Sequence, residues 1–316
     1  MRPRVLVIAG PTAVGKTETA ILVARRLGGE IISADSMQVY RGFDIGTAKP
    51  TPAEQQGIPH HLIDIRDPWE EFSVVDFQNL ADQLIREINA RGRLPILVGG
   101  TGFYIRATLR SYTFAELETD GSVRAALYAE ADRIGAPALH RRLAEVDPEA
   151  AARIHPNDKL RIVRALEVYT LTGQPISRLQ QQAGDRYDHL LVGLQMDREE
   201  LYRRINQRVD RMLAAGWLEE VRRLLAAGGP PRRGPMANLG YRELVAYLRG
   251  LATWEETVDW IKRNTRRYAK RQLTWFRREP DIRWVDAGAG PQAAAEAVCR
   301  LAAGKWPDLV EKSGSA

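Results

Sequence analysis

The eight residues from Gly10 to Thr17 constrain this chain more than any other stretch. They read GPTAVGKT and match the phosphate-loop pattern G-x-x-x-x-G-K-[ST] at every required position. An apolar run at residues 5–9 predicts a buried strand before them, and an amphipathic pattern at residues 18–27 predicts a helix after them. In that setting glycines allow a tight turn whose backbone N–H groups point at phosphate oxygens. The stretch therefore predicts that this protein binds a chain of phosphates.

Each residue type in this loop has a chemical use. The positive end of the following helix favours an anion, and Lys16 adds a mobile cation. The hydroxyl of Thr17 is suited to a Mg²⁺ ion that is also bound by phosphate oxygens. We expect the whole loop to form the phosphate site: Gly10, Pro11, Thr12, Ala13, Val14, Gly15, Lys16 and Thr17.

The first third of the chain alternates strand and helix patterns. Further strands are predicted at residues 30–34, 60–65 and 94–98, and a capping box at Ser73 begins a helix that runs to residue 91. Such alternation predicts an α/β fold, a parallel sheet flanked by helices as in phosphate-loop NTPases. Ligands of such sheets bind at the carboxyl ends of the strands, so Asp35 should face the phosphate loop.

The chain lacks a clear apparatus for hydrolysing a nucleotide. Phosphate-loop NTPases carry a second strand that ends in an acidic residue for Mg²⁺, whereas the strand at 94–98 ends in glycines. Only Asp35 and Asp64 are placed to serve that role, and Asp35 is the better placed of the two. The sequence thus predicts binding of a di- or triphosphate without its hydrolysis.

The pattern changes to helices without intervening strands between residues 116 and 185. Helices are predicted at 122–134, 137–146 and 157–171. The strand pattern returns at 189–194 and is followed by a long helix from Arg198 to about Ala214. We therefore predict an α/β core formed by residues 1–115 and 186–316, with an inserted all-helical domain at 116–185.

Positive charge concentrates on a predicted helix from Trp254 to about Arg278. The net charge of the chain is +6, and this helix carries Lys262, Arg263, Arg266, Arg267, Lys270 and Arg271. So many cations on one helix favour an anionic partner, and a nucleic-acid backbone is the obvious one. Ile261, Tyr268 and Trp275 recur at seven-residue spacing and should form the core face of the helix.

The composition bears on the compartment and the oligomeric state of the protein. The single cysteine, Cys299, excludes an internal disulfide and suits a reducing cytoplasm. No apolar stretch approaches the length of a membrane span, and nothing in the sequence points to an obligate oligomer, so a cytoplasmic monomer is expected.

Several blocks of sequence resemble one family, the tRNA dimethylallyltransferases. They are GPTAVGKT at 10–17, ISADSMQVYRGFDIGTAKPT at 32–51, VGGTGFYIRATL at 98–109, HPNDKLRIVRALEVY at 155–169, LGYREL at 239–244 and TRRYAKRQLTWFRRE at 265–279. These blocks span nearly the whole chain in the family's order. The segments DSMQ and GGTGFY are specific to the family, whereas many families share the phosphate loop.

The resemblance implies transfer of a dimethylallyl group from dimethylallyl diphosphate to the N6 amine of the adenosine on the 3′ side of the tRNA anticodon. Asp35 matches the family's general base, and the phosphate loop with Lys16, Arg208 and a Mg²⁺ ion near Thr17 would hold the leaving diphosphate. Contacts with the anticodon stem-loop are implied for Asp35, Ser36, Met37, Gln38, Thr101, Arg124, Lys159, Arg161, Arg164, Gly240, Tyr241 and Arg242.

Three alternatives remain open from the sequence. A transferase that prenylates free adenine nucleotides would share the pocket but have no use for the inserted helices and the basic helix. A small-molecule kinase would use the same loop for ATP and would need a phosphoryl acceptor site. A non-catalytic RNA-binding module would have no need of a carboxylate at the phosphate site, where Asp35 is expected.

Overall fold

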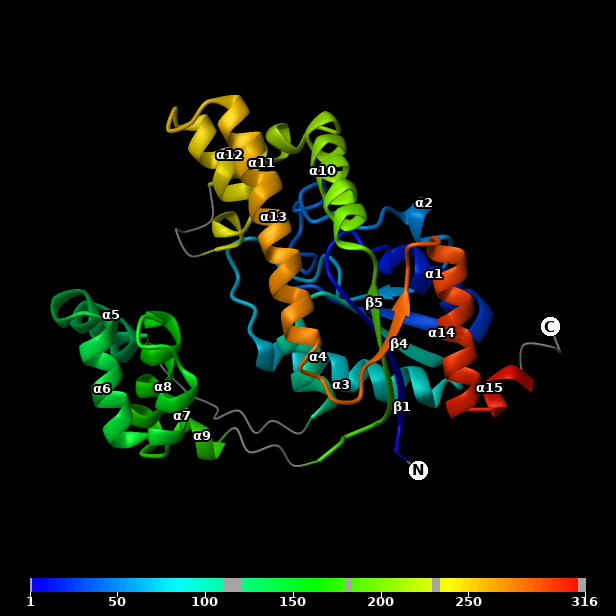
Figure 1. Cartoon of the computed structure of the whole chain (residues 1–316), viewed down its shortest axis with the longest axis horizontal. Helices are drawn as coiled ribbons and strands as arrows, with labels where there is room; N and C mark the ends of the chain where they lie inside the picture. The colour runs from blue at the N-terminus through cyan, green and yellow to red at the C-terminus, as the bar shows by residue number, and fades with distance from the viewer. Residues whose placement is uncertain (1, 111–120, 180–183, 229–233, 312–316) are drawn as a thin grey trace. The chain divides into compact units, whose positions relative to one another are not determined.

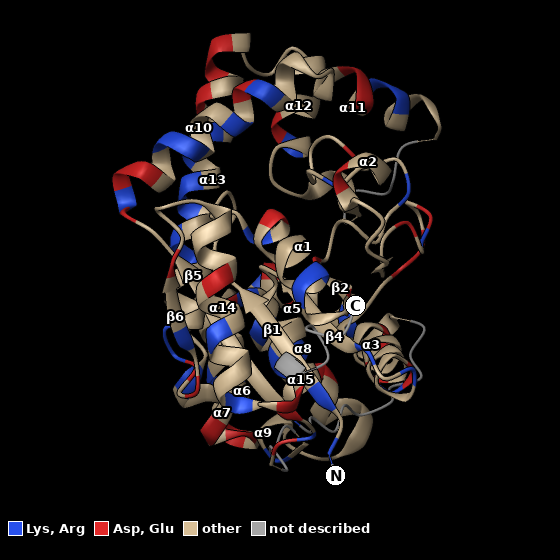
Figure 2. Cartoon of the chain, turned by 90° about the vertical axis from the view of Figure 1, so that its right-hand side faces the viewer, with Lys and Arg blue, Asp and Glu red and all other residues tan. Residues whose placement is uncertain are grey.

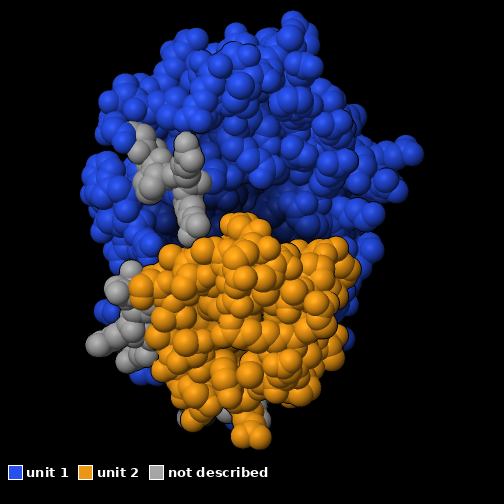
Figure 3. Space-filling view, turned by 90° about the vertical axis from the view of Figure 1, so that its left-hand side faces the viewer, with its two compact units in different colours: residues 1–109, 187–316 blue, residues 110–186 orange. Residues whose placement is uncertain are grey.

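The computed structural model describes residues 2–110, 121–179, 184–228 and 234–311. The chain divides into two compact units, one made of Met1–Leu109 and Tyr187–Ala316 and the other of Arg110–Arg186 (Figures 1 and 3). The boundary predicted between residues 115 and 116 lies outside the described residues. The first unit contains the sheet. Among the described residues of the second unit, every named element is a helix, and one isolated β-bridge joins Arg110 to Asp185.

A parallel six-stranded sheet forms the centre of the first unit. Its spatial order is β3-β2-β4-β1-β5-β6, and every neighbouring pair is parallel. The strands are β1 (Arg4–Ala9), β2 (Gly29–Ala34), β3 (His60–His61), β4 (Leu94–Gly99), β5 (Asp188–Gln195) and β6 (Arg283–Asp286). The α/β fold with a parallel sheet is thereby confirmed.

The sheet has two apolar faces because successive side chains of a strand point to opposite sides. Leu6 and Ile8 of β1 pack on one side, where α1 (Lys16–Leu27) and α14 (Pro291–Lys305) lie. Val5 and Val7 pack on the other, against α3 (Val74–Ala90) and α4 (Gly102–Leu109). The predicted capping box at the start of α3 is confirmed, since Ser73 Oγ accepts from the backbone N–H of Asp76.

The prediction of a strand at residues 60–65 is wrong beyond His61. Leu62 and Asp64 adopt positive φ angles of 62° and 56°, which end the extended run. The backbone N–H of Asp64 donates to Gln38 O, and Lys49 Nζ bonds the carboxylate of Asp64 at 2.5 Å. This segment is therefore held by the loop that follows β2 rather than by the sheet.

A third apolar cluster joins that loop to four later helices. They are α10 (Arg198–Ala214), α11 (Trp217–Ala226), α12 (Tyr241–Leu248) and α13 (Trp254–Phe276), with a short 3₁₀ turn at Pro235–Ala237 before α12. Phe43 of the loop packs with Trp217, Tyr241 and Ile261, all four at most 2% exposed. The remaining short helices of this unit are α2 (Pro52–Gln55) and α15 (Asp308–Glu311).

The second unit has its own apolar core. Its helices are α5 (Ser122–Ile134), α6 (Ala136–Val146), α7 (Pro148–Arg153), α8 (Lys159–Thr172) and α9 (Ile176–Leu179). Leu139, Leu143, Ile162 and Leu166 form the centre of this core, each at most 1% exposed. Across the described part of the chain, no helix is both long enough and apolar enough to cross a bilayer.

Candidate active site

Three strands end at the same edge of the sheet, and this register assembles the site. Ala9 of β1 pairs with Gly99 of β4, and Gly99 also pairs with Ala34 of β2. The next residue of each strand therefore leaves the sheet beside the others. These residues begin the phosphate loop, the segment that starts with Asp35, and the glycine-rich turn at 100–102. The predicted placement of Asp35 at the carboxyl end of a strand is confirmed.

The predicted phosphate loop joins β1 to α1. Gly10, Ala13 and Gly15 have positive φ angles of 150°, 66° and 98°, so the backbone turns tightly before α1 begins at Lys16. Among the described residues, no side chain caps the amino end of α1. The first N–H groups of a helix need a partner, and an anion suits them because the helix dipole is positive there.

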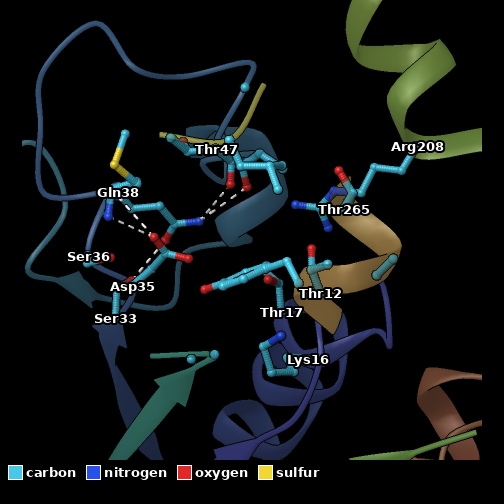
Figure 4. A pocket seen from close by; sticks show the side chains of 18 of the residues that line it. Thr12, Lys16, Thr17, Ser33, Asp35, Ser36, Gln38, Thr47, Arg208 and Thr265 are labelled. Atoms are coloured by element: carbon cyan, nitrogen blue, oxygen red, sulfur yellow. Dashed lines mark hydrogen bonds between the residues drawn. The ribbon is translucent and has the colours of Figure 1, made fainter. Parts of the chain in front are cut away.

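A cavity of about 460 Å³ lies at this edge. The described residues that line it belong to the first unit. They include residues of the phosphate loop, the segments 35–38 and 46–50, α10, α12 and α13. Figure 4 shows Thr12, Lys16, Thr17, Asp35, Gln38 and Arg208 around this space. Its volume is in the range of cavities that hold small molecules and cofactors. Asp64 does not line it and is bonded to Lys49 instead.

The segment after β2 is fixed by hydrogen bonds of its own side chains. Asp35 Oδ1 accepts from the backbone N–H of Met37 at 2.8 Å. Gln38 Oε1 accepts from Ser33 Oγ at 2.9 Å, and its amide nitrogen lies 3.3 Å from Thr47 O (Figure 4). Asp35 and Gln38 are therefore held at the cavity wall by local bonds, and Asp35 has a second carboxylate oxygen besides the one that anchors the turn.

Charges around the cavity act on one another. Burial lowers the pKa of Lys16 to about 7, and the nearby cation Arg208 contributes to this shift while Asp35 opposes it. Burial also lowers the pKa of Arg208, again opposed by Asp35. Lys16 Nζ donates to Pro11 O at 2.7 Å. Two basic side chains and one carboxylate thus lie around one cavity, and the two cations repel each other unless an anion lies near them.

The prediction that Tyr268 belongs to the core face of α13 is wrong. Ile261 is buried in one apolar cluster and Trp275 packs against another, but Tyr268 lines the cavity together with Arg271. Burial raises the pKa of the Tyr268 hydroxyl, and the negative charge of Asp35 raises it further. Residues at seven-residue spacing lie on one side of a helix. On that side of α13, the middle residue, Tyr268, faces the cavity rather than other apolar side chains.

A buried carboxylate that the sequence analysis missed organises the far wall. Glu220 of α11, which is 1% exposed, accepts from the backbone N–H groups of Asp44, Ile45 and Gly46. It also accepts from the hydroxyl of Tyr241 at 2.7 Å. Tyr241 is itself 1% exposed, so its hydroxyl serves this network. A predicted contact between Tyr241 and RNA stays a prediction.

The residues next to Tyr241 are held in a similar way. Gly240 has a φ of 87°, and a Cβ atom there would lie 2.1 Å from the ring of Trp217. Its N–H donates to Glu243 Oε2 at 2.7 Å. Arg242 bonds Glu243 Oε1 at 2.9 Å, and its side chain remains 55% exposed. Of these predicted RNA contacts, Arg242 is the one that reaches solvent.

The other predicted RNA contacts fall in separate places. Thr101 Oγ1 accepts from the backbone N–H of Ser36 at 3.2 Å, so the structure brings Thr101 to the segment that contains Asp35. Lys159 pairs with Asp132, and Arg161 pairs with Asp158 at 3.0 Å, all on the second unit. These two cations lie on α8 at its amino end.

Arg124 and Arg164 of the second unit share one buried carboxylate. Glu167, which is fully buried, receives hydrogen bonds from Arg124 at 2.9 Å and from Arg164 at 2.8 Å. Burial raises the pKa of Glu167, but the bonds from both arginines outweigh it and leave the pKa lowered. Both guanidinium side chains remain more than two-fifths exposed. They are thus fixed in place at the surface of this unit.

Lys and Arg residues recur along α10 and α13 in the first unit (Figure 2). On α13, Lys262 pairs with Asp210 and Arg266 donates to Asn206 Oδ1, both partners on α10. Arg267 and Lys270 are exposed and form no ion pair with another described residue. These two cations are the part of the helix most available to an anionic partner.

Comparisons with known proteins point to one family. The family model for IPP transferases matches residues 38–279. The tRNA dimethylallyltransferase of Symbiobacterium thermophilum is 60% identical over 312 residues, which cover 97% of each chain. That of Geobacillus kaustophilus is 53% identical over 309 residues, covering 96% of this chain and 98% of the relative.

Solved structures agree. The full-length tRNA isopentenylpyrophosphate transferase of Bacillus halodurans is 46% identical with a TM-score of 0.73, covering 99% of this chain and all of that one. A eukaryotic dimethylallyltransferase acting on tRNA is 32% identical with a TM-score of 0.78, covering 90% and 74% of the two chains. The region matched by the family model contains Gln38, Arg208 and the whole of α13. From the family model and the relatives together, the chain belongs to the IPP transferase family.

Proposed function

We propose that this protein transfers a dimethylallyl group from dimethylallyl diphosphate to the N6 amine of the adenosine 3′-adjacent to the tRNA anticodon. The amine nitrogen forms a bond with C1 of the dimethylallyl group as the bond from C1 to the diphosphate oxygen breaks. The products are N6-isopentenyladenosine in the RNA and free diphosphate. The observation that carries this proposal is that Asp35 lies in one cavity with Lys16 and Arg208, close enough for its charge to affect both.

Asp35 is assigned the role of general base. The lone pair of the adenine N6 amine is delocalised into the ring, so the amine becomes a useful nucleophile only when a positioned group accepts its proton. The Asp35 carboxylate anchors the turn through one oxygen, which leaves the other for the amine proton. Ser36, Met37 and Gln38 follow on the same turn and are assigned to contact the target nucleotide, with Thr101 bonded to Ser36 N beside them.

The leaving diphosphate is assigned to the phosphate loop. The bond from C1 to oxygen breaks with negative charge building on the diphosphate, and donors fixed in advance around that charge lower the barrier. Lys16, Arg208 and the N–H groups at the start of α1 surround the cavity on that side. Lys16 and Arg208 repel each other. An anion bound between them is attracted to both side chains and also offsets their mutual repulsion.

A Mg²⁺ ion fits the donor set at this place. The structure contains no cluster of three or more His, Cys, Asp or Glu side chains suited to a metal among its described residues. Mg²⁺ commonly takes few protein ligands and several phosphate oxygens. We assign the Thr17 hydroxyl as the protein ligand, and when bound the ion would neutralise part of the charge on the diphosphate.

Binding of dimethylallyl diphosphate at pH 8 should take up a proton. With its pKa lowered to about 7, Lys16 is mostly neutral at pH 8 in the free protein. The anionic ligand restores a higher pKa, so we expect an uptake of up to about one proton at pH 8 and less at pH 6, where Lys16 is already charged. Calorimetry without RNA, repeated in buffers of different ionisation enthalpy, measures this number.

The Lys16→Arg variant is the control for that measurement. Arginine stays protonated throughout this pH range, so the uptake at pH 8 should disappear even if the ligand still binds. An equal uptake in both proteins would show that Lys16 is not the group that titrates.

The RNA is assigned to the basic surface of α13 and to the second unit. The target base must leave its stack in the anticodon loop, which costs a few kcal/mol, and contacts to the surrounding RNA offset that cost. Arg267 and Lys270 of α13 are exposed, and the second unit presents Lys159, Arg161, Arg124 and Arg164 at its surface. From the first unit, Gly240, Tyr241 and Arg242 are assigned to the same RNA.

Reversing two charges on α13 should weaken RNA binding and its dependence on salt. For the Arg267→Glu, Lys270→Glu protein we expect the plot of log affinity against log salt to become less steep by about 0.7 for each phosphate that the protein no longer neutralises. The control is Arg86→Glu, Arg300→Glu, which makes the same charge change at exposed positions of α3 and α14. Binding curves by fluorescence anisotropy at several salt concentrations test this, and equal slopes in all three proteins would remove α13 from the interface.

We also propose that the protein works as a monomer in the cytoplasm, where its RNA substrate is found.

Three acceptors distinguish the proposed function from its alternatives. Labelled dimethylallyl diphosphate and Mg²⁺ would be supplied with an anticodon stem-loop that carries the target adenine, with the same RNA after that base is changed, or with AMP. We expect label only in the unaltered stem-loop. Label in AMP would instead assign the protein to the enzymes that prenylate free nucleotides, and label in none would favour a kinase, tested with ATP.

A further inference from the structure

Gln272 is a buried polar side chain of α13 that lines the cavity beside Tyr268. It is 6% exposed and lies between Ala269 and Phe276, which are at most 1% exposed. Both ends of its amide are bonded. Its Oε1 accepts from the backbone N–H of Thr12 at 2.9 Å, and its Nε2 donates to Gly100 O at 3.0 Å. One side chain of α13 therefore joins the phosphate loop after β1 to the glycine-rich turn after β4.

The glycines of that turn leave room for the close approach of side chains from α13. A Cβ atom on Gly100 would lie 2.1 Å from Gln272 Nε2, and one on Gly102 would lie 2.2 Å from Cδ1 of Trp275. Gln272 and Trp275 are three residues apart and therefore lie on the same side of the helix. The GGTG sequence thus permits contact between α13 and the ends of the central strands.

The same turns of α13 carry the charges assigned to RNA binding. Lys270 is exposed, while Arg271 and Tyr268 line the cavity. Lys270 and Gln272 lie in the same turn of α13, so a shift of that turn that moves Lys270 also moves Gln272. Thr12 and Gly100 would respond directly, because Gln272 bonds the backbone of both.

We propose that Gln272 is a positioning residue that couples RNA binding on α13 to diphosphate binding in the phosphate loop. This inference rests on the function proposed above. By bonding Thr12 N, the Gln272 amide fixes the direction of the loop, so the remaining N–H groups face the diphosphate. RNA that holds α13 in place strengthens this arrangement, and the coupling is reciprocal because it is a property of the binding equilibria.

Two substitutions separate the two bonds of the amide. Gln272→Met keeps the length and much of the volume of the side chain but removes both hydrogen bonds. Gln272→Glu keeps an acceptor for Thr12 N but removes the donor to Gly100 O. Gln83→Met is the matched control, since Gln83 is exposed on α3 and bonds only Glu87 among the described residues.

The measurement is the affinity for the anticodon stem-loop with and without saturating inorganic diphosphate and Mg²⁺. For the unaltered protein and for Gln83→Met we expect diphosphate to strengthen RNA binding by about tenfold, within the usual range of such couplings. For Gln272→Met, diphosphate should strengthen RNA binding by less than about threefold. The affinity for RNA alone should stay within about twofold of that of the unaltered protein. A purely structural role would instead change the affinity for RNA alone and leave the factor intact.

Full coupling in Gln272→Met, or no coupling in the unaltered protein, would overturn this role for Gln272. If circular dichroism shows that Gln272→Met does not fold, Gln272→Glu is the deciding variant. We then expect diphosphate to strengthen its RNA binding by between about threefold and tenfold. The same strengthening as in the unaltered protein would count against the proposal. Failure of the proposed function is distinguishable, because then the unaltered protein would bind neither ligand or would transfer no prenyl group to the RNA.

Discussion

The Asp35→Asn substitution should slow prenyl transfer by about 10²- to 10⁴-fold, the usual contribution of a general base. The amide cannot accept the proton of the adenine amine. Its oxygen can still accept from Met37 N, as Asp35 Oδ1 does at 2.8 Å, so the turn keeps its shape. We expect RNA affinity to change by less than about twofold. Single-turnover transfer with labelled donor gives the rate, and fluorescence anisotropy gives the affinity.

Asp67→Asn is the matched control for this prediction. Asp67 belongs to the same long loop region but pairs with Arg41 at 2.8 Å and does not line the cavity. Its substitution should leave the transfer rate unchanged. An Asp35→Asn protein that keeps more than a few per cent of the rate would show that another group accepts the proton.

The Lys16→Met substitution should lower kcat/KM for dimethylallyl diphosphate by about 10²- to 10³-fold, as when a fixed donor to a developing negative charge is lost. Methionine is unbranched and only one atom shorter than lysine, and it removes the positive charge beside Arg208. Both donor binding and departure of the diphosphate should suffer, so we expect KM to rise and kcat to fall. Steady-state kinetics with varied donor at saturating RNA separate the two effects.

Lys305→Met provides the comparison, since Lys305 is at the end of α14 and pairs with Asp188 at 3.0 Å, away from the cavity. Unchanged kinetics in Lys16→Met would mean that the diphosphate is held elsewhere. A decrease in RNA affinity of similar size would mean that the substitution disturbs the fold rather than the donor site.

The parts of the site that follow from local sequence were predictable. The phosphate loop, the strand before it and the helix after it are encoded within short stretches, because an apolar run, glycines and a helix start suffice to define them. The position of Asp35 at a strand end followed from the same reasoning. In the second unit, the helix predicted at 122–134 has the bounds of α5, again because its pattern is local.

The parts that depend on distant segments were not predictable. β3 stops at His61 because the residues after it bond the loop at 38–39, which no local pattern reveals. Tyr268 was assigned to the core because helical spacing identifies a side of α13 but not what faces it. Gln272 did carry a signal, as a polar residue between apolar positions of a helix, yet its two partners lie 260 and 172 residues away.

Buried carboxylates form a second class that the sequence analysis missed. Glu220 accepts three backbone N–H groups of the 44–46 segment, and Glu167 holds Arg124 and Arg164. On a helical pattern each of them resembles an ordinary surface glutamate. Their burial is compensated by partners that come from other elements, as a buried charge requires. Only the folded structure brings those partners together.

The most direct test of the account is to locate the transferred group and count the diphosphate released with it. The unaltered protein, Mg²⁺, dimethylallyl diphosphate and a full-length tRNA would be incubated, and the RNA digested and analysed by mass spectrometry while released diphosphate is measured. The account predicts a dimethylallyl group on N6 of the adenosine 3′-adjacent to the anticodon, with one diphosphate released for each group transferred. A modification at another atom or another position, or diphosphate released without transfer to RNA, would contradict it.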